Sequence, residues 1–109
     1  MIVQDALPFD VVLLGMGEDG HTASLFPNDI YDENALVHTI YDSPKPPAER
    51  VTLSAKALSN TQTLFFCITG ANKRDALKRW HLGENLPVAK VNALQSLDVY
   101  VDFAASETI

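Results

Sequence analysis

Cysteine is nearly absent from this chain, which has one cysteine among 109 residues. No disulfide can form within the chain, and a reducing compartment, the cytoplasm, is expected. Long apolar runs are absent too, since none approaches the roughly 20 residues that a helix needs to cross a membrane. The first residues, Met1 to Asp5, lack the basic start and apolar stretch of a signal peptide.

Basic residues are also few. Eight Lys and Arg stand against 14 Asp and Glu, which gives a net charge of -6. A nucleic-acid-binding domain needs a basic face that neutralises phosphates, so the charge balance disfavours that class of protein. A small anionic substrate is still compatible with this balance, because a few cations can dominate the potential of one pocket. Neither nucleic acid nor a membrane is therefore an expected partner.

The composition of the chain is that of a soluble globular protein, with 47% apolar residues and a mean hydropathy near zero. Its length suits one small domain. Apolar periodicity and turn residues predict both strands and short helices. The expected strands span residues 9–14, 37–41, 51–53, 63–69 and 97–103. The expected helices span residues 22–26, 54–59 and 87–94, with Ser54 as the N-cap of the second. A further helix is expected to begin at residue 70 or 72 and to end near residue 80.

This alternation of strands and helices predicts an α/β fold with a mainly parallel, Rossmann-like sheet flanked by helices. In such sheets, ligands bind beyond the carboxyl ends of the strands. Two glycine-containing loops, 15–20 and 70–73, each follow an expected strand. We therefore expect both loops at the edge of the sheet where ligands bind.

The first of these loops carries the most distinctive sequence, which reads Gly-Met-Gly-Glu-Asp-Gly-His-Thr-Ala-Ser-Leu-Phe-Pro from Gly15 to Pro27. Glycines let the backbone approach a ligand closely, and a helix over 22–26 would point free N–H groups at an anion. His21 supplies a side chain of the type that transfers protons near neutral pH. A plain structural turn is the alternative interpretation of such a loop.

The same loop also fits the dinucleotide-binding pattern G-x-G-x-x-G. That pattern requires a long helix packed on the sheet after the glycines. Pro27 would end any helix here after about two turns, and Asp19 would place a negative charge beside a pyrophosphate. We therefore reject a dinucleotide site, and no cofactor is expected.

The whole string from Gly15 to Pro27 resembles the signature of 6-phosphogluconolactonases, whose superfamily includes glucosamine-6-phosphate deaminases and ribose-5-phosphate isomerases. Further segments agree with this family in order and character. They are the proline-rich loop and strand at 43–54, the strand and helix start at 65–74, and the short segments 86–89 and 99–102. The resemblance therefore covers most of the chain and implies the C-terminal half of such a protein.

The resemblance implies hydrolysis of 6-phosphogluconolactone to 6-phosphogluconate, in the pentose phosphate pathway, by a water that His21 deprotonates and with no metal. Asp19 is expected to orient His21, although a turn that Asp19 forms with its own backbone is an equal alternative. The expected substrate-binding residues are Gly15, Gly17, Gly20, Arg50, Gly70 and Lys73. Arg50 and Lys73 are the phosphate ligands, because Arg offers paired hydrogen bonds and Lys a point charge. For Arg50, a surface charge paired with a nearby acid is the alternative.

The chain departs from the family in one respect. The family's proteins are considerably longer, and their N-terminal half carries a Ser/Thr-Gly-Gly phosphate loop and an Asp-Glu-Arg segment that have no counterpart here. Residues 1–109 are therefore expected to form the C-terminal portion of a single α/β domain that lacks its N-terminal half. We expect strand 9–14 to be an unpaired sheet edge, which could support self-association.

Two other functions remain open at this point. One is the sister deaminase and sugar-phosphate isomerase branch, and the other is a non-catalytic fragment that keeps part of a sugar-phosphate site. No His, Cys or carboxylate group has the spacing of metal ligands. Cys67 is expected to be a buried apolar residue, and Ser24 to pack in a helix, because it lacks the Gly-x-Ser-x-Gly turn of a nucleophile.

Overall fold

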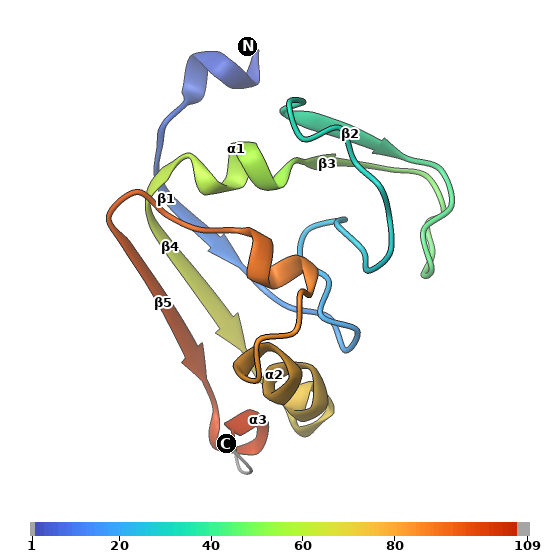
Figure 1. The fold of residues 1–109 in the computed structure, drawn as a ribbon, viewed down its shortest axis with the longest axis vertical. Helices are drawn as coiled ribbons and strands as arrows, with labels where there is room; N and C mark the ends of the chain where they lie inside the picture. Colours follow the sequence, from blue (N-terminus) through green and yellow to red (C-terminus); the bar gives the residue numbers. More distant parts are fainter. Residues whose placement is uncertain (1, 107–109) are drawn as a thin grey trace.

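The computed structural model describes residues 2–106 (Figure 1). Its strands are β1 Phe9–Leu14, β2 Val37–Ile40, β3 Arg50–Leu53, β4 Thr61–Ile68 and β5 Ser96–Val101. Its α-helices are α1 Ala55–Ser59, α2 Arg74–His81 and α3 Phe103–Ser106. Short 3₁₀ segments cover Val3–Ala6, Ala71–Lys73 and Pro87–Lys90. Within the described residues, no helix is long and apolar enough to cross a membrane.

The main sheet is parallel, as the sequence predicted, with the strand order β1-β4-β5 (Figure 1). Strand β4 lies in the middle, and its side chains Leu64, Phe66 and Ile68 are fully buried on one face. Their spacing of two residues places all three on the same side of the strand. Because β1 and β4 are parallel neighbours, the loops that follow them leave the sheet at the same edge.

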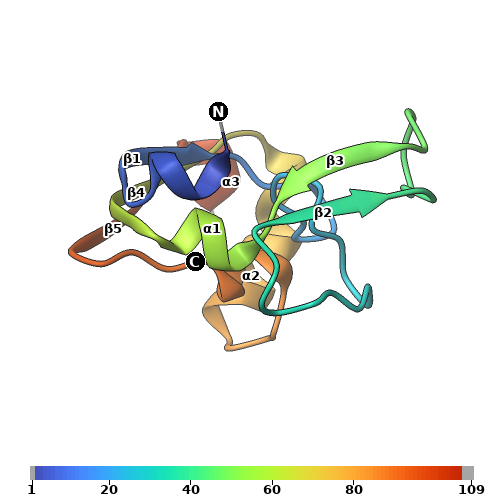
Figure 2. The same ribbon diagram turned by 90° about the horizontal axis from the view of Figure 1, so that it is seen from above.

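The helices cover the sheet face that carries these three side chains (Figure 2). Ala76 and Leu77 of α2 are buried there, and Trp80 meets the ring of Phe66 edge-on at 5.0 Å between centroids. This confirms the predicted apolar face of the helix. Burial of such side chains supplies the main driving force for the fold, at about 25 cal/mol per Å² of apolar surface.

The opposite face of the sheet is not covered by any part of residues 2–106. Val11 and Leu13 of β1 are 57% and 65% exposed, and Tyr100 of β5 is 57% exposed. Cys67 is exposed as well, so the prediction of a buried cysteine was wrong. The reason is its position in β4, since it alternates with Phe66 and Ile68 and therefore points to the uncovered side.

The two remaining strands form a separate antiparallel hairpin, β2 paired with β3. Both strands were expected from the sequence, but not their separation from the main sheet. Helix α1 follows β3, and the Ser54 hydroxyl accepts the N–H of Ala57 at 3.0 Å, which confirms the predicted N-cap. The expected helix over 87–94 is only the short 3₁₀ segment Pro87–Lys90.

Candidate active site

Two loops meet at the carboxyl edge of the parallel sheet, one after β1 and one after β4. The Lys73 ammonium donates to the Met16 carbonyl at 2.5 Å, and the Asn72 amide donates to the Glu18 carboxylate at 2.6 Å. Between the loops lies an open groove of about 390 Å³. Its lining comprises Gly15, Met16, Gly17, Glu18, His21, Thr22, Ala23, Lys45, Asn72 and Lys73. The sequence-based expectation that both loops share one edge is therefore confirmed.

The loop after β1 is held by its own hydrogen bonds and by a buried threonine. Thr22 is 1% exposed, and its hydroxyl donates to the Gly15 carbonyl at 2.7 Å. The N–H of Gly17 donates to the His21 carbonyl at 2.8 Å, which closes the loop on itself. These bonds fix the backbone from which His21 projects.

The expected helix over residues 22–26 does not form. Thr22 and Leu25 instead make an isolated antiparallel bridge around a tight turn, and Ala23 has a φ of 50°. A residue in the left-handed region cannot continue a right-handed helix. The site therefore has no helix N-terminus at this loop, and anion attraction there has to come from side chains and loop N–H groups. Ser24, predicted to pack in that helix, instead donates its N–H to the Thr52 hydroxyl at 3.1 Å.

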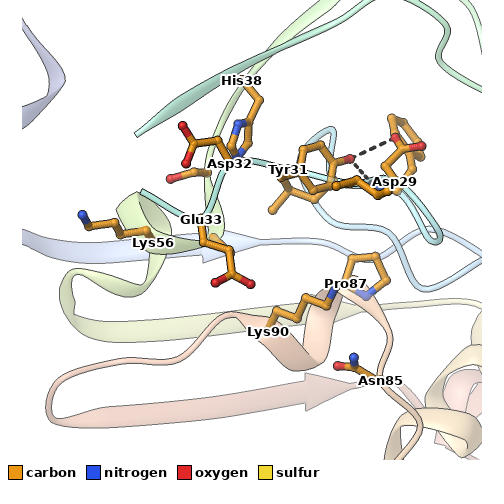
Figure 3. Close-up of a pocket in the computed structure, with 14 residues that line it drawn as sticks. Asp29, Tyr31, Asp32, Glu33, His38, Lys56, Asn85, Pro87 and Lys90 are labelled. Carbon is orange, nitrogen blue, oxygen red and sulfur yellow. Dashed lines mark hydrogen bonds between the residues drawn. The ribbon is translucent and has the colours of Figure 1, made fainter. Parts of the chain in front are cut away.

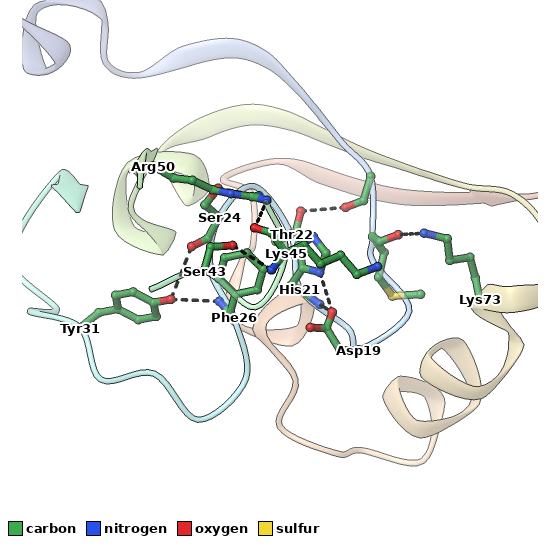
Figure 4. Close-up of polar contacts among 12 residues, drawn as sticks. Asp19, His21, Thr22, Ser24, Phe26, Tyr31, Ser43, Lys45, Arg50 and Lys73 are labelled. Carbon is green, nitrogen blue, oxygen red and sulfur yellow. Dashed lines mark hydrogen bonds and ion pairs between the residues drawn. The ribbon is translucent and has the colours of Figure 1, made fainter. Parts of the chain in front are cut away.

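His21 and Asp19 form the central pair of the site (Figure 4). The Asp19 Oδ1 atom lies 2.5 Å from the imidazole Nδ1 and also accepts the His21 backbone N–H at 3.0 Å. One carboxylate oxygen thus fixes both the backbone and the ring of the same residue. With Nδ1 engaged by Asp19, the imidazole Nε2 is the nitrogen left for another partner.

Two further residues hold the imidazole ring in place, and the sequence alone did not identify either role. A Cβ atom on Gly17 would lie 2.0 Å from both Nδ1 and Cε1 of His21, so only glycine leaves room for the ring. The buried Phe26 ring packs against the imidazole with 4.7 Å between centroids. The orientation of His21 is therefore fixed by the Asp19 carboxylate, by the space that Gly17 leaves and by the Phe26 ring.

The pKa of Asp19 reports on this arrangement. Partial burial by itself raises the pKa of the carboxyl, but the hydrogen bonds and the positive charge of His21 outweigh it. The net effect holds the pKa of Asp19 below its ordinary value of 3.8. A carboxylate whose pKa is lowered by folding stabilises the fold above its unfolded pKa, and this contribution is lost as the pH falls through the folded value.

Replacing His21 with alanine should therefore raise the pKa of Asp19. The variant loses the side-chain hydrogen bond and the charge, while the burial that raises the pKa stays. Carbon-13 NMR of the Asp19 carboxyl as a function of pH measures the midpoint in both proteins. His81→Ala, at an exposed histidine at the end of α2, is the matched control and should leave the midpoint unchanged. An unchanged midpoint in His21→Ala would mean that the imidazole does not hold the carboxylate.

The other predicted site residues fall into two groups. Gly15, Gly17, His21 and Lys73 line the groove, and Asp19 stands directly behind His21. Gly20, Gly70 and Arg50 are not among the lining residues of the groove.

Lys45 lines the groove as well, but the sequence analysis did not single it out. Its place in the Ser-Pro-Lys-Pro-Pro loop was a usable signal, because prolines stiffen a loop and present its side chains in a fixed direction.

Gly20 and Gly70 have backbone roles. Gly20 is buried with a φ of 85°, and a Cβ there would meet the Leu86 side chain at 2.9 Å. Gly70 has a φ of 99°, and its N–H donates to both carboxylate oxygens of Asp102 at 3.1 and 3.2 Å. Both positions favour glycine because of the left-handed backbone.

Arg50 packs behind the groove, at the start of β3. Its guanidinium donates to the carbonyls of Lys45, Pro46 and Pro47 at 2.9, 3.1 and 3.1 Å, and it lies over the Phe26 ring at 5.4 Å. The structure thus pairs Arg50 with loop carbonyls rather than with a nearby acid. Among the described residues, no group of three or more His, Cys, Asp or Glu side chains could hold a metal ion.

A second hollow, of about 630 Å³, lies on the other side of Phe26 between the β2–β3 hairpin, α1 and the segment Pro87–Lys90 (Figure 3). Asp29, Asp32, Glu33, Lys56 and Lys90 contribute charges of both signs to its lining. The Tyr31 hydroxyl lies there too and accepts the Phe26 N–H at 2.9 Å, so it braces the residue that packs on His21. His21, Asp19 and Lys73 do not line this hollow.

Comparison with known proteins identifies the family of this chain. The sequence pattern of the family described as glucosamine-6-phosphate isomerases/6-phosphogluconolactonase matches residues 2–100, so the chain belongs to that family. The chain is 46% identical over 78 residues to human 6-phosphogluconolactonase, across 69% of this chain and 30% of the human one. It is 39% identical to a probable 6-phosphogluconolactonase of Drosophila melanogaster, across 93% of this chain and 44% of that one.

Solved structures agree with this assignment. The crystal structure of 6-phosphogluconolactonase from Thermotoga maritima matches with a TM-score of 0.82 and 31% identity, over 91% of this chain and 46% of that one. A monomeric glucosamine-6-phosphate deaminase matches with a TM-score of 0.70 but only 18% identity, which shows a shared fold alone. The chain spans less than half the length of these relatives.

Proposed function

We propose that this chain carries the general base and part of the anion-binding surface of a 6-phosphogluconolactonase, the hydrolase of 6-phosphogluconolactone in the pentose phosphate pathway. The observation that carries the proposal is the His21–Asp19 pair in an open groove that also holds Lys45 and Lys73. We further propose that residues 1–109 are the C-terminal portion of a single lactonase-type α/β domain. One cysteine suits a reducing compartment such as the cytoplasm, although rice and Arabidopsis relatives are named chloroplastic.

In this proposal His21 acts as base and then as acid. The imidazole Nε2 takes a proton from water while the water oxygen bonds to the lactone carbonyl carbon. The tetrahedral intermediate then breaks its bond to the ring oxygen, and the imidazolium returns the proton to that oxygen as it leaves. Asp19 stabilises the imidazolium that exists between the two steps. The products are a hydroxyl and a carboxylic acid, and the acid releases its remaining proton to solvent near neutral pH to give the carboxylate, so water is the only other reactant.

The groove supplies electrostatic support for these steps. The Lys73 ammonium lies beside the loop after β1, and Gly15 and Gly17 line the groove with it. Gly20 and Gly70 hold the shapes of the two loops. A lactone is an activated ester, so a positioned general base together with stabilisation of the developing oxyanion is sufficient for its hydrolysis.

Assays with two substrates test the proposed function. Because the relatives are longer, the chain is assayed in two forms. One form is the chain alone. The other, which we call the complemented chain, also contains the part of the Thermotoga maritima enzyme that the chain does not match, either as a second polypeptide or fused to it. The complemented chain should accelerate opening of 6-phosphogluconolactone above the spontaneous rate and should leave glucosamine 6-phosphate unchanged. Deamination of glucosamine 6-phosphate would favour the sister branch, and no activity in either assay would favour a non-catalytic role.

Hydrolysis should survive metal chelators. The proposed water activation uses an imidazole, and the part of the chain that the structure describes offers no cluster of metal ligands. The measurement is lactone hydrolysis by the complemented chain before and after treatment with EDTA. Loss of activity that zinc or magnesium restores would overturn the proposed water activation.

Gly17→Ala should disable the base without unfolding the chain. The new Cβ would occupy the place of the imidazole ring, and the ring can yield by rotating away from Asp19. We expect hydrolysis to fall by about two to four orders of magnitude, the usual cost of losing a general base. The circular dichroism spectrum should be unchanged.

A double variant checks that Gly17 acts through His21. If it does, Gly17→Ala combined with His21→Ala should be no slower than His21→Ala alone, because residues that act as a unit have non-additive effects. Losses that multiply would assign Gly17 a separate role, such as direct contact between its backbone and the substrate.

A further inference from the structure

Phe26 connects the groove to the second hollow. It is 3% exposed, and its ring packs on the imidazole of His21 with 4.7 Å between centroids. The Arg50 guanidinium lies over the same ring at 5.4 Å. Phe26 also belongs to the lining of the hollow. A change in the position of Phe26 would therefore move the surface on which the imidazole of the base rests.

The backbone at Phe26 belongs to no helix or strand. Ala23 and Asn28, on either side of it, have φ values of 50° and 68°, so the segment passes twice through the left-handed region. Such conformations persist only where surrounding contacts hold them. Within residues 2–106, the Phe26 N–H donates to no backbone carbonyl, and its acceptor is the Tyr31 hydroxyl at 2.9 Å (Figure 4). This hydroxyl therefore anchors the backbone that carries the Phe26 ring.

The Tyr31 hydroxyl is itself oriented by a carboxylate. It donates to Oδ2 of Asp29 at 3.0 Å, which leaves its oxygen lone pairs for the Phe26 N–H (Figure 3). Hydrogen bonds in a chain polarise one another, so this donation makes the oxygen a better acceptor. Burial raises the pKa of Tyr31 above its ordinary value of 10.0, and the Asp29 carboxylate adds to this effect. The hydroxyl thus keeps its proton near neutral pH.

Tyr31 lines the hollow and is not among the lining residues of the groove, so it can affect the reaction only through other residues. We propose that Tyr31 is a positioning residue for catalysis, whose hydroxyl, oriented by Asp29, fixes Phe26 and thereby the imidazole of His21. The proposal rests on the proposed function and adds to it a residue outside the groove. A misplacement of about 1 Å at a reacting group can cost about 100-fold in rate, so a distant anchor can matter.

Tyr31→Phe removes the hydroxyl and keeps the ring, which packs on His38 at 4.7 Å between centroids. In the complemented chain, kcat for 6-phosphogluconolactone should fall by up to about 100-fold. KM should change little, because Tyr31 does not line the groove. Tyr41→Phe is the matched control at a tyrosine that is 73% exposed, and it should behave as wild type. An unchanged kcat in Tyr31→Phe, or a loss expressed in KM alone, would overturn the proposal.

A double variant checks the route from Tyr31 to the base. If Tyr31 acts through the imidazole, Tyr31→Phe combined with His21→Ala should be no slower than His21→Ala alone. Losses that multiply would show that the hydroxyl supports the site in another way, and they would overturn the positioning role.

Carbon-13 NMR of the Asp19 carboxyl gives a readout that needs no lactone hydrolysis. Burial raises the pKa of Asp19, but the hydrogen bonds and charge of His21 outweigh it. Tyr31→Phe should loosen the imidazole and shift the midpoint upward, toward that of His21→Ala, whereas Tyr41→Phe should not. This shift would support the positioning role even if the wild type opened no lactone. A wild-type midpoint in the folded variant would overturn the role and leave the lactonase function standing.

Asp29→Ala keeps the proposal testable if Tyr31→Phe does not fold, because Asp29 is exposed. Without this carboxylate, the hydroxyl is left with the more distant Ser24 carbonyl, at 3.5 Å, as its acceptor. The Asp19 midpoint should rise and kcat should fall, each by less than in Tyr31→Phe. Asp32→Ala is the matched control, since Asp32 lines the same hollow but accepts the Asn34 N–H. Equal results for the two aspartate variants would count against the proposal and, without a folded Tyr31→Phe, would overturn it.

Discussion

His21→Ala should reduce lactone hydrolysis by the complemented chain about 100- to 10,000-fold, the usual contribution of a general base. The Asp19 carboxylate would then have no imidazole to orient, and water would meet the lactone without a proton acceptor. The side chain of His21 is 19% exposed and packs on Phe26, so its removal takes away one ring contact and no buried hydrogen-bond network. We therefore expect kcat to fall while the fold persists.

The control for this variant is His38→Ala. His38 also packs against an aromatic ring, that of Tyr31 at 4.7 Å between centroids, but it lines the other hollow. It should keep near-normal turnover. Full activity in His21→Ala with an unchanged pH profile would show that the base lies elsewhere in the protein.

The 109-residue chain by itself should not open the lactone measurably faster than water does. The groove is open and offers His21, Lys45 and Lys73, whereas the chain spans less than half the length of its relatives. Positioning of the reactants lowers the activation free energy by up to roughly 7–11 kcal/mol in well-oriented reactions. A site that lacks part of its contacts with the substrate loses most of this reduction. Addition of the part of the longer relative that the chain does not match should restore catalysis.

The same chain should self-associate. Val11 and Leu13 are exposed on the uncovered sheet face, and β1 is an edge strand. Parallel sheets usually have both faces covered, and exposed edges and apolar patches favour association. Size-exclusion chromatography should therefore show species larger than a monomer that grow with concentration. A monomer with substantial catalysis would contradict both expectations.

Charged substitutions test whether this face is responsible. Val11→Lys combined with Leu13→Lys should shift the chain toward the monomer and should also weaken rescue by the added polypeptide. Ile30→Lys is the matched control, because Ile30 is 98% exposed but belongs to the second hollow. Equal effects of both changes would point to general solubility rather than to the sheet face.

Local patterns in the sequence determined much of the fold. Alternating and continuous apolar runs predicted β1, β4 and β5, and the glycines after β1 and β4 predicted two loops at one edge of a parallel sheet. The sequence from Gly15 to Pro27 also predicted the family, and the family match over residues 2–100 confirmed this prediction. These features depend on residues close together in the chain, so periodicity and composition reveal them.

Only the tertiary structure decided which residues share the groove. Arg50 lies against the carbonyls of its own loop, and Lys45 reaches the groove instead. Cys67 faces outward because nothing in residues 2–106 covers that side of β4. A helix over 22–26 was locally plausible, yet the turn at Ala23 replaced it. In each case the outcome depends on contacts between distant segments, and the free energy of such contacts exceeds the small local preferences that a sequence pattern expresses.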